Sequence, residues 1–116
     1  MSAPTRPSPL NRRSWPRVRL RQPATVTIAG SAAFTGETCD LGRDGIGFMS
    51  PRPISPGRRG EVAFELPQAA GGAGLTVPIK VVHSSYVERD QFQIGAAFLE
   101  LQPEAAQAIA AFLETA

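Results

Sequence analysis

Arginine side chains are concentrated near the start of the chain. Residues 12–21 read RRSWPRVRLR, which places five arginines in ten residues with no acidic residue among them. Six of the twelve basic residues precede the first acidic residue, Glu37, although the formal net charge of the whole chain is only +2. A run of one charge sign is either a solvated tail or an element that binds an oppositely charged partner. We therefore expect an anionic partner at this end of the chain, with a solvated tail as the alternative.

A second stretch combines a carboxylate with glycines. Residues 40–45 read DLGRDG, so Asp40, Gly42 and Gly45 form an Asp-x-Gly-x-x-Gly pattern at the junction of two predicted strands. An ionised carboxylate only accepts hydrogen bonds, and glycine lets the backbone approach a ligand closely or adopt a positive φ. The same residue types also favour a tight turn, so a purely structural role is the alternative.

Together the two stretches resemble the paired signature of the PilZ domain family of cyclic di-GMP receptors. Arg13 and Arg17 form an Arg-x-x-x-Arg pattern, and DLGRDG follows at the family's spacing. The resemblance covers about residues 12–114, including IGAAF near the last predicted strand. It implies a small six-stranded antiparallel β-barrel with a C-terminal helix and a cyclic di-GMP ligand. The second motif departs from the family at position 42, where glycine stands in place of the usual serine.

The resemblance also implies a set of ligand-binding residues, three arginines and three residues of the second motif: Arg12, Arg13, Arg17, Asp40, Gly42 and Gly45. A planar guanidinium group can bind a phosphate, or the O6/N7 edge of guanine, through two hydrogen bonds. A carboxylate can accept hydrogen bonds from the guanine N1 and N2 donors. The absent hydroxyl at position 42 removes one neutral hydrogen bond, worth about 0.5–1.5 kcal/mol, so we expect a weakened site.

Short strands are expected to position these motifs. Apolar and polar residues alternate in segments bounded by Gly and Pro, which predicts six strands at 24–28, 34–41, 45–50, 61–66, 75–87 and 91–101. In the second segment the alternation places Cys39 and Leu41 in the core and turns Asp40 outward. Six short strands in so small a chain have edges that must be covered, and closure into a barrel achieves this.

The end of the chain has a helical period instead. Ala105, Ile109 and Phe112 recur at helical spacing, and Pro103 suits the first turn of a helix. We expect this helix to cover an open end of the barrel. With 116 residues the chain forms one domain, in which residues 12–116 are the barrel with its arginine-rich arm (12–22) and residues 1–11 are a disordered, Pro- and Ser-rich lead-in.

Three other residues invite a chemical interpretation. Trp15 could stack on a guanine, although an aromatic side chain more often packs on apolar surface. His83 shares the parity of the apolar residues around it, so we expect it to be buried or at a strand end. Cys39 is expected to be a small core residue, and nothing orients a nucleophilic Cys39–His83 pair. No metal-ligand cluster is indicated.

These observations favour a receptor without enzymatic activity and without a cofactor. One cysteine and no apolar run of signal-peptide or membrane-spanning length indicate a cytoplasmic protein that does not insert into membranes. We expect the arm to be mobile without ligand, to order on binding cyclic di-GMP and so to signal to an effector protein in trans. The alternative, favoured by Gly42, is a barrel that no longer binds ligand and acts only as a protein adaptor. Nucleic acid is a less suitable partner, because the body has no basic stripe and few aromatic residues.

Overall fold

A computed structural model describes residues 17–67 and 74–115 of the chain. Within them lie seven strands and one helix: β1 (Val18–Arg19), β2 (Pro23–Ile28), β3 (Phe34–Leu41), β4 (Gly45–Ser50), β5 (Arg59–Glu65), β6 (Gly74–Glu88), β7 (Gln91–Phe98) and α2 (Pro103–Thr115). The six longer strands correspond to the segments that the alternation of apolar residues predicts, and the helix corresponds to the segment with a helical period.

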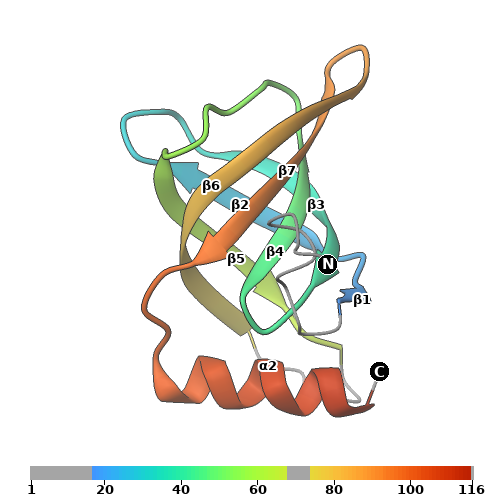
Figure 1. Ribbon diagram of the computed structural model, residues 1–116, viewed down its shortest axis with the longest axis vertical. Coiled ribbons are helices and arrows are strands. Elements are labelled where there is room, and N and C mark those ends of the chain that lie inside the picture. Colours follow the sequence, from blue (N-terminus) through green and yellow to red (C-terminus); the bar gives the residue numbers. More distant parts are fainter. Residues whose placement is uncertain (1–16, 68–73, 116) are drawn as a thin grey trace, which may run out of the picture.

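Strands β2 to β7 form a closed antiparallel barrel (Figure 1). The strand order is β3-β2-β5-β6-β7-β4, and an additional pairing between β3 and β4 closes the ring. Alternate residues point inward, and Val26, Val62, Val77 and Ile79 are fully inaccessible to solvent. Burying each such side chain stabilises the fold by about 1.5–3 kcal/mol. The predicted six-stranded barrel is confirmed.

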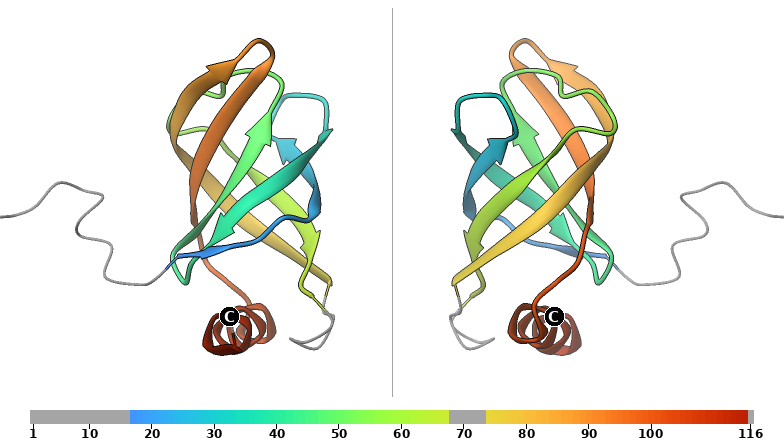
Figure 2. Two further views of the ribbon diagram at one scale, coloured as in Figure 1. Left: turned by 90° about the vertical axis from the view of Figure 1, so that its right-hand side faces the viewer. Right: turned by 90° about the vertical axis from the view of Figure 1, so that its left-hand side faces the viewer.

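Helix α2 covers one end of the barrel (Figure 2). It buries Ala105, Ile109 and Phe112, which are the residues that the helical spacing selects. Glu104 lies in the first turn, where a negative charge interacts favourably with the helix dipole. In the part of the chain that the structure describes, no helix is long and apolar enough to cross a membrane.

Strand β1 is an addition that the sequence did not predict. Val18 and Arg19 pair with Leu41 and Asp40 of β3, and the Leu20 amide donates a hydrogen bond to the Cys39 carbonyl at 3.1 Å. Leu20 itself is buried in the core. The expectation that the whole arm is mobile without ligand is therefore wrong for residues 18–22, because backbone hydrogen bonds to β3 and the burial of Leu20 hold them on the barrel. Residues 12–16 of the arm lie outside the described residues.

A bulge in β3 reverses the predicted orientation of two side chains. The pairing of β3 with β4 shifts register between Thr38 and Asp40, which leaves Cys39 as the additional residue. Thr38 is buried, whereas Cys39 is only half-buried. Placing Cys39 in the core was wrong, because one additional residue shifts the period-two alternation. Leu41 is buried and Asp40 points outward, as expected.

A second bulge changes the position of His83. The pairing of β6 with β7 shifts register between Val81 and His83, so that His83 lies opposite Gly95 on the outer face of the barrel. The His83 side chain is exposed and lies in the middle of β6. The prediction of a buried or strand-end histidine is therefore wrong, and the cause is again an additional residue in the strand.

Candidate ligand-binding site

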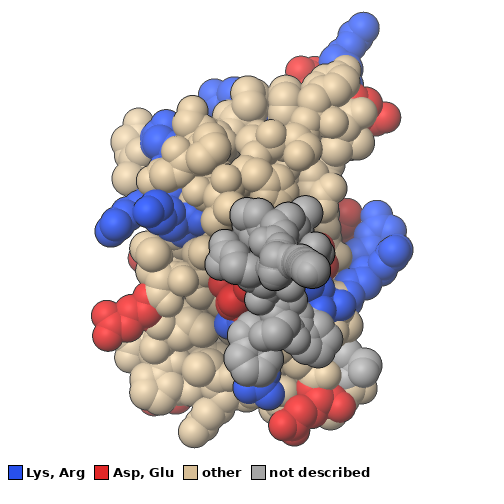
Figure 3. All heavy atoms as spheres, viewed as in Figure 1, with Lys and Arg blue, Asp and Glu red and all other residues tan. Residues whose placement is uncertain are grey.

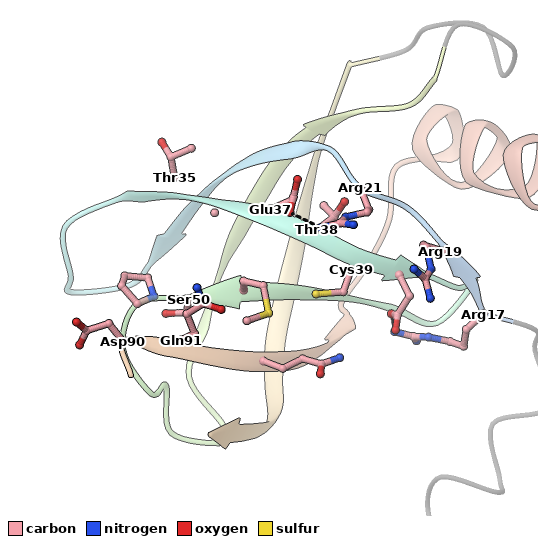
Figure 4. Close-up of a pocket in the computed structure, with 15 residues that line it drawn as sticks. Arg17, Arg19, Arg21, Thr35, Glu37, Thr38, Cys39, Ser50, Asp90 and Gln91 are labelled. Atoms are coloured by element: carbon pink, nitrogen blue, oxygen red, sulfur yellow. Dashed lines mark hydrogen bonds and ion pairs between the residues drawn. The ribbon is translucent and has the colours of Figure 1, made fainter. Parts of the chain in front are cut away.

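A groove of about 1010 Å³ lies on the outer face of the barrel over β3, β4 and β7 (Figure 4). Its lining is mostly polar and includes arginines from around β1, acidic residues and amides: Arg17, Arg19, Arg21, Glu37, Asp40, Asp90, Gln91 and Gln93. Figure 4 shows Arg17 at one end of the groove and Asp90 at the other. Such a volume is at the upper end of the range for small-molecule sites, about 300–1000 Å³.

Arg17 and Asp40, one from each sequence motif, meet at the end of this groove. Arg17 Nη2 donates a hydrogen bond to Asp40 Oδ1 at 2.6 Å, and Arg17 Nη1 donates one to Asp44 Oδ1 at 3.2 Å. The Arg17 side chain is 22% exposed and that of Asp40 33% exposed, so the pair is partly shielded from water. On the space-filled surface, basic side chains project beside acidic ones on the side of the molecule where β1 lies (Figure 3).

Asp44 is a site residue that the sequence interpretation missed. It belongs to the turn between β3 and β4 and shares the Arg17 guanidinium with Asp40. It lies inside the DLGRDG stretch, which therefore holds a second carboxylate close to the first. The spacing of the motif gave no reason to separate it from an ordinary turn residue.

The two motif glycines have different structural roles. The Gly42 amide donates a hydrogen bond to the Gly45 carbonyl at 2.9 Å, so the motif is also a tight turn. Neither glycine has a positive φ, in contrast to Gly30 and Gly57, so of the two uses of glycine considered above a positive φ does not apply at Gly42 or Gly45. A Cβ on Gly45 would overlap the carbonyl oxygen of Ala96 in β7. Glycine at position 45 therefore permits close packing of β4 against β7.

Alanine in place of Gly45 is expected to destabilise the domain. The added methyl group would collide with backbone of β7, which can move only by distorting the barrel, at a cost of about 1–3 kcal/mol. Urea unfolding followed by circular dichroism measures this free energy. Gly42→Ala is the matched control, because its Cβ would meet side-chain atoms instead, and it should change stability by less than about 0.5 kcal/mol. Equal stability of the two variants would contradict this account.

Asp40 and His83 cover two paired glycines on the outer face. Gly47 of β4 pairs with Gly95 of β7, and these two lie opposite Asp40 and His83 respectively. A Cβ on Gly47 would lie 2.9 Å from Asp40 Oδ1, and the His83 ring fills the space that a Cβ on Gly95 would need. Two glycines without side chains, Gly47 and Gly95, thus lie between the carboxylate of Asp40 and the imidazole of His83. Only the strand register reveals this arrangement, since Asp40 and His83 are far apart in sequence.

Cys39 is poorly suited to nucleophilic chemistry. Burial raises the pKa of its thiol, and the negative charges of Asp40 and Glu37 raise this pKa further, so the thiol stays protonated at neutral pH. His83 cannot assist, because β4 and β7 lie between β3 and β6 in the barrel. Among residues 17–67 and 74–115 there is also no group of His, Cys, Asp and Glu that could hold a metal ion.

Arg21 contributes a weaker contact at the groove. Its Nη2 donates a hydrogen bond to Glu37 Oε1 at 3.4 Å, and both side chains are exposed. Exposed pairs of this kind contribute about 0–1 kcal/mol, so Arg21 can readily exchange Glu37 for another anion. Four of the predicted site residues lie in the described part of the chain. Arg17, Asp40 and Gly42 come together, and Gly45 is hydrogen-bonded to Gly42 in the same turn. Arg12, Arg13 and Trp15 lie outside the described residues.

Comparison with known proteins decides the family. The model of the PilZ domain matches residues 11–115, which is nearly the whole chain. The chain belongs to the PilZ domain family. No curated protein matches the sequence.

Solved structures share the fold of this PilZ domain at low sequence identity. The Bacillus subtilis inhibitor of motility, MotI/DgrA, has a TM-score of 0.74 and 10% identity, with coverage of 89% of this chain. The Escherichia coli YcgR PilZ domain with c-di-GMP has a TM-score of 0.71 and 14% identity, with 90% of both chains covered. The PilZ domain of CeSA from a cellulose-synthesizing bacterium has a TM-score of 0.61 and 20% identity, with 85% of this chain and 95% of that one covered. This chain spans 50% of MotI/DgrA.

Proposed function

We propose that this PilZ domain is a receptor for cyclic di-GMP and binds it in the groove over β3, β4 and β7. The observation that carries the proposal is the contact of Arg17 with Asp40. These two residues come from motifs 23 residues apart and meet at 2.6 Å at the end of the groove. The similar E. coli YcgR domain was solved with c-di-GMP, which supports the same ligand for this chain.

The chemistry of the groove suits a cyclic dinucleotide with two phosphates and two guanines. The three arginines that line it can each bind a phosphate or the O6/N7 edge of guanine. Asp40 can accept hydrogen bonds from guanine N1 and N2, and the amides of Gln91 and Gln93 can both donate and accept. In this proposal Arg12 and Arg13 extend the cationic end, Gly42 and Gly45 shape the turn beside it, and no cofactor or catalytic step is involved.

Isothermal titration calorimetry tests the proposed ligand. The intact protein is expected to bind cyclic di-GMP and to bind cyclic di-AMP about tenfold or more weakly, because adenine carries a donor where guanine has the O6 acceptor. Equal affinity for both dinucleotides would indicate phosphate binding alone and would contradict a guanine site. Circular dichroism of the same sample shows whether the domain is folded.

We also propose that binding alters the disposition of the arm and so signals to an effector protein in trans. The arm reaches the groove through Arg17, and residues 18–22 are already paired with β3 or hydrogen-bonded to it. The change therefore concerns the residues that precede Arg17. Arg12 and Arg13 would be drawn to the ligand by its phosphates.

Limited trypsin digestion tests this change. Cyclic di-GMP is expected to slow cleavage after Arg12 and Arg13 strongly, because a bound guanidinium group cannot enter the protease. Cleavage after Arg19 should change little, since this residue is already paired in β1. Arg58, in the loop before β5 and absent from the groove lining, provides the internal control. Unchanged cleavage after Arg13 at saturating ligand would exclude the arm as the switch.

A second candidate function is a protein adaptor that does not bind the dinucleotide. Two observations favour it: Gly42 offers no hydroxyl, and the Arg17 guanidinium already has two carboxylate partners. The exposed large apolar side chains of the described residues, Val82, Tyr86 and Val87, all lie on β6 and could contact another protein. This candidate predicts a folded domain without measurable cyclic di-GMP binding.

A further inference from the structure

The Arg17 side chain occupies the space next to Gly42 in which a side chain of residue 42 would lie. Gly42 has no positive φ, so its backbone conformation does not itself require glycine. A Cβ at this position would lie 2.8 Å from Arg17 Cδ and 3.3 Å from Arg17 Nη1. Real Cβ atoms do not approach another carbon so closely. The observed position of the Arg17 side chain is therefore possible only because residue 42 has no side chain.

Asp44 uses the space that Gly42 leaves open. With Arg17 lying across the turn, its Nη1 reaches Asp44 Oδ1 at 3.2 Å while Nη2 remains on Asp40. The same imagined Cβ would lie 3.2 Å from Asp44 Oδ1, so it would be in tight contact with both members of this ion pair. Arg17 is thus held by two carboxylates, one from β3 and one from the β3–β4 turn.

We infer that Gly42 and Asp44 together hold Arg17 in a closed position that the ligand must open. The inference rests on the proposed cyclic di-GMP site and concerns how that site is regulated. A phosphate or guanine that binds the Arg17 guanidinium group has to replace its contacts with Asp40 and Asp44. The free energy of those contacts is therefore lost from the binding free energy of the ligand. Asp44 acts as a positioning residue. Glycine at position 42 lowers affinity by admitting the closed position as well as by lacking a hydroxyl.

Alanine at position 42 separates these two effects. Gly42→Ala adds a Cβ but no hydrogen-bonding group, so only displacement of Arg17 can tighten binding. We expect a gain in cyclic di-GMP affinity of about two- to fivefold, the range for breaking one partly exposed ion pair. Gly42→Ser should gain at least as much, because it displaces Arg17 and also supplies a hydroxyl. The atoms that the new Cβ meets belong to the flexible side chains of Arg17 and Asp44 and not to backbone, so both variants should fold.

Asp44→Asn tests the contribution of the Arg17–Asp44 contact to the closed position. It should also tighten binding by about two- to fivefold, because the neutral amide holds Arg17 less strongly. Asp90→Asn is the matched control, since it removes the same charge at the opposite end of the groove (Figure 4). A gain with Asp44→Asn that exceeds the gain with Asp90→Asn identifies a specific contact, because general repulsion of the phosphates would act at both positions.

The double variant Gly42→Ala with Asp44→Asn completes the test by calorimetry. Both changes act through Arg17, so their combined gain should be smaller than the product of the separate gains. If the wild type binds and Gly42→Ala binds no more tightly, the closed position is refuted while the proposed ligand stands. If the wild type fails to bind and Gly42→Ala binds, the inference is supported. If no folded variant binds cyclic di-GMP at high micromolar concentration, the proposed function fails and the inference with it.

Discussion

Replacement of Arg17 by alanine is expected to weaken cyclic di-GMP binding by at least about thirtyfold. The guanidinium group would lose two charge-assisted hydrogen bonds to the ligand, each worth about 1.5–3 kcal/mol. This loss exceeds the gain from freeing Asp40 and Asp44, because the partly exposed ion pairs of Arg17 contribute only about 0–1 kcal/mol. Arg13→Ala is expected to have an effect of similar size. Calorimetric titration of each variant measures the change.

Arg59→Ala is the control for the arginine variants. Arg59 lies on β5, outside the groove lining, and its removal changes the net charge by the same amount. Its affinity should stay within about twofold of the wild type, as expected for a surface change away from the site. Thermal unfolding of Arg17→Ala should also be close to that of the wild type. Retention of wild-type affinity by both Arg13→Ala and Arg17→Ala would show that these two arginines do not bind the ligand.

Asp40→Ala is expected to reduce the affinity by about ten- to a hundredfold. The guanine N1 and N2 donors would lose a charged acceptor, which costs about 1.5–3 kcal/mol. The direction of this change in affinity tests the role of Asp40. If Asp40 did not bind guanine, removing its negative charge near an anionic ligand would raise the affinity. Glu61→Ala, on β5, removes an equal charge away from the groove and should leave the affinity unchanged. Tighter binding by Asp40→Ala would show that this carboxylate only opposes the ligand.

The strands could be predicted from the sequence because each buries one face. Alternation with a period of two places Val62 and Phe64 of β5 inward, and both are buried in the barrel. The alternation failed at Cys39 and His83, since Cys39 is itself an additional residue in β3 and His83 follows one in β6, and local sequence marks neither bulge. Strand β1 escaped prediction because two residues are too few to show a period.

Only the site residues that belong to the two sequence motifs could be predicted. Arg17 and Asp40 were selected because their motifs resemble the PilZ signature, and the barrel places them at 2.6 Å. Asp44 could not be distinguished from an ordinary turn residue, and the closeness of His83 to Gly95 depends on the register of two long strands. Glycine at position 42 leaves room for the Arg17 side chain, which comes from a distant part of the sequence. The spacing of the motif alone does not reveal this contact.

The central claim is that cyclic di-GMP binds in the groove over β3, β4 and β7. Two-dimensional ¹H–¹⁵N NMR of the intact protein during titration with cyclic di-GMP tests both the binding and its place. We predict saturable shifts for the amides of residues 17–21, 37–45 and 91–95, with β5 residues 59–65 unchanged. No shift at high micromolar ligand, or shifts that saturate on β5 while the groove amides stay unchanged, would contradict the claim.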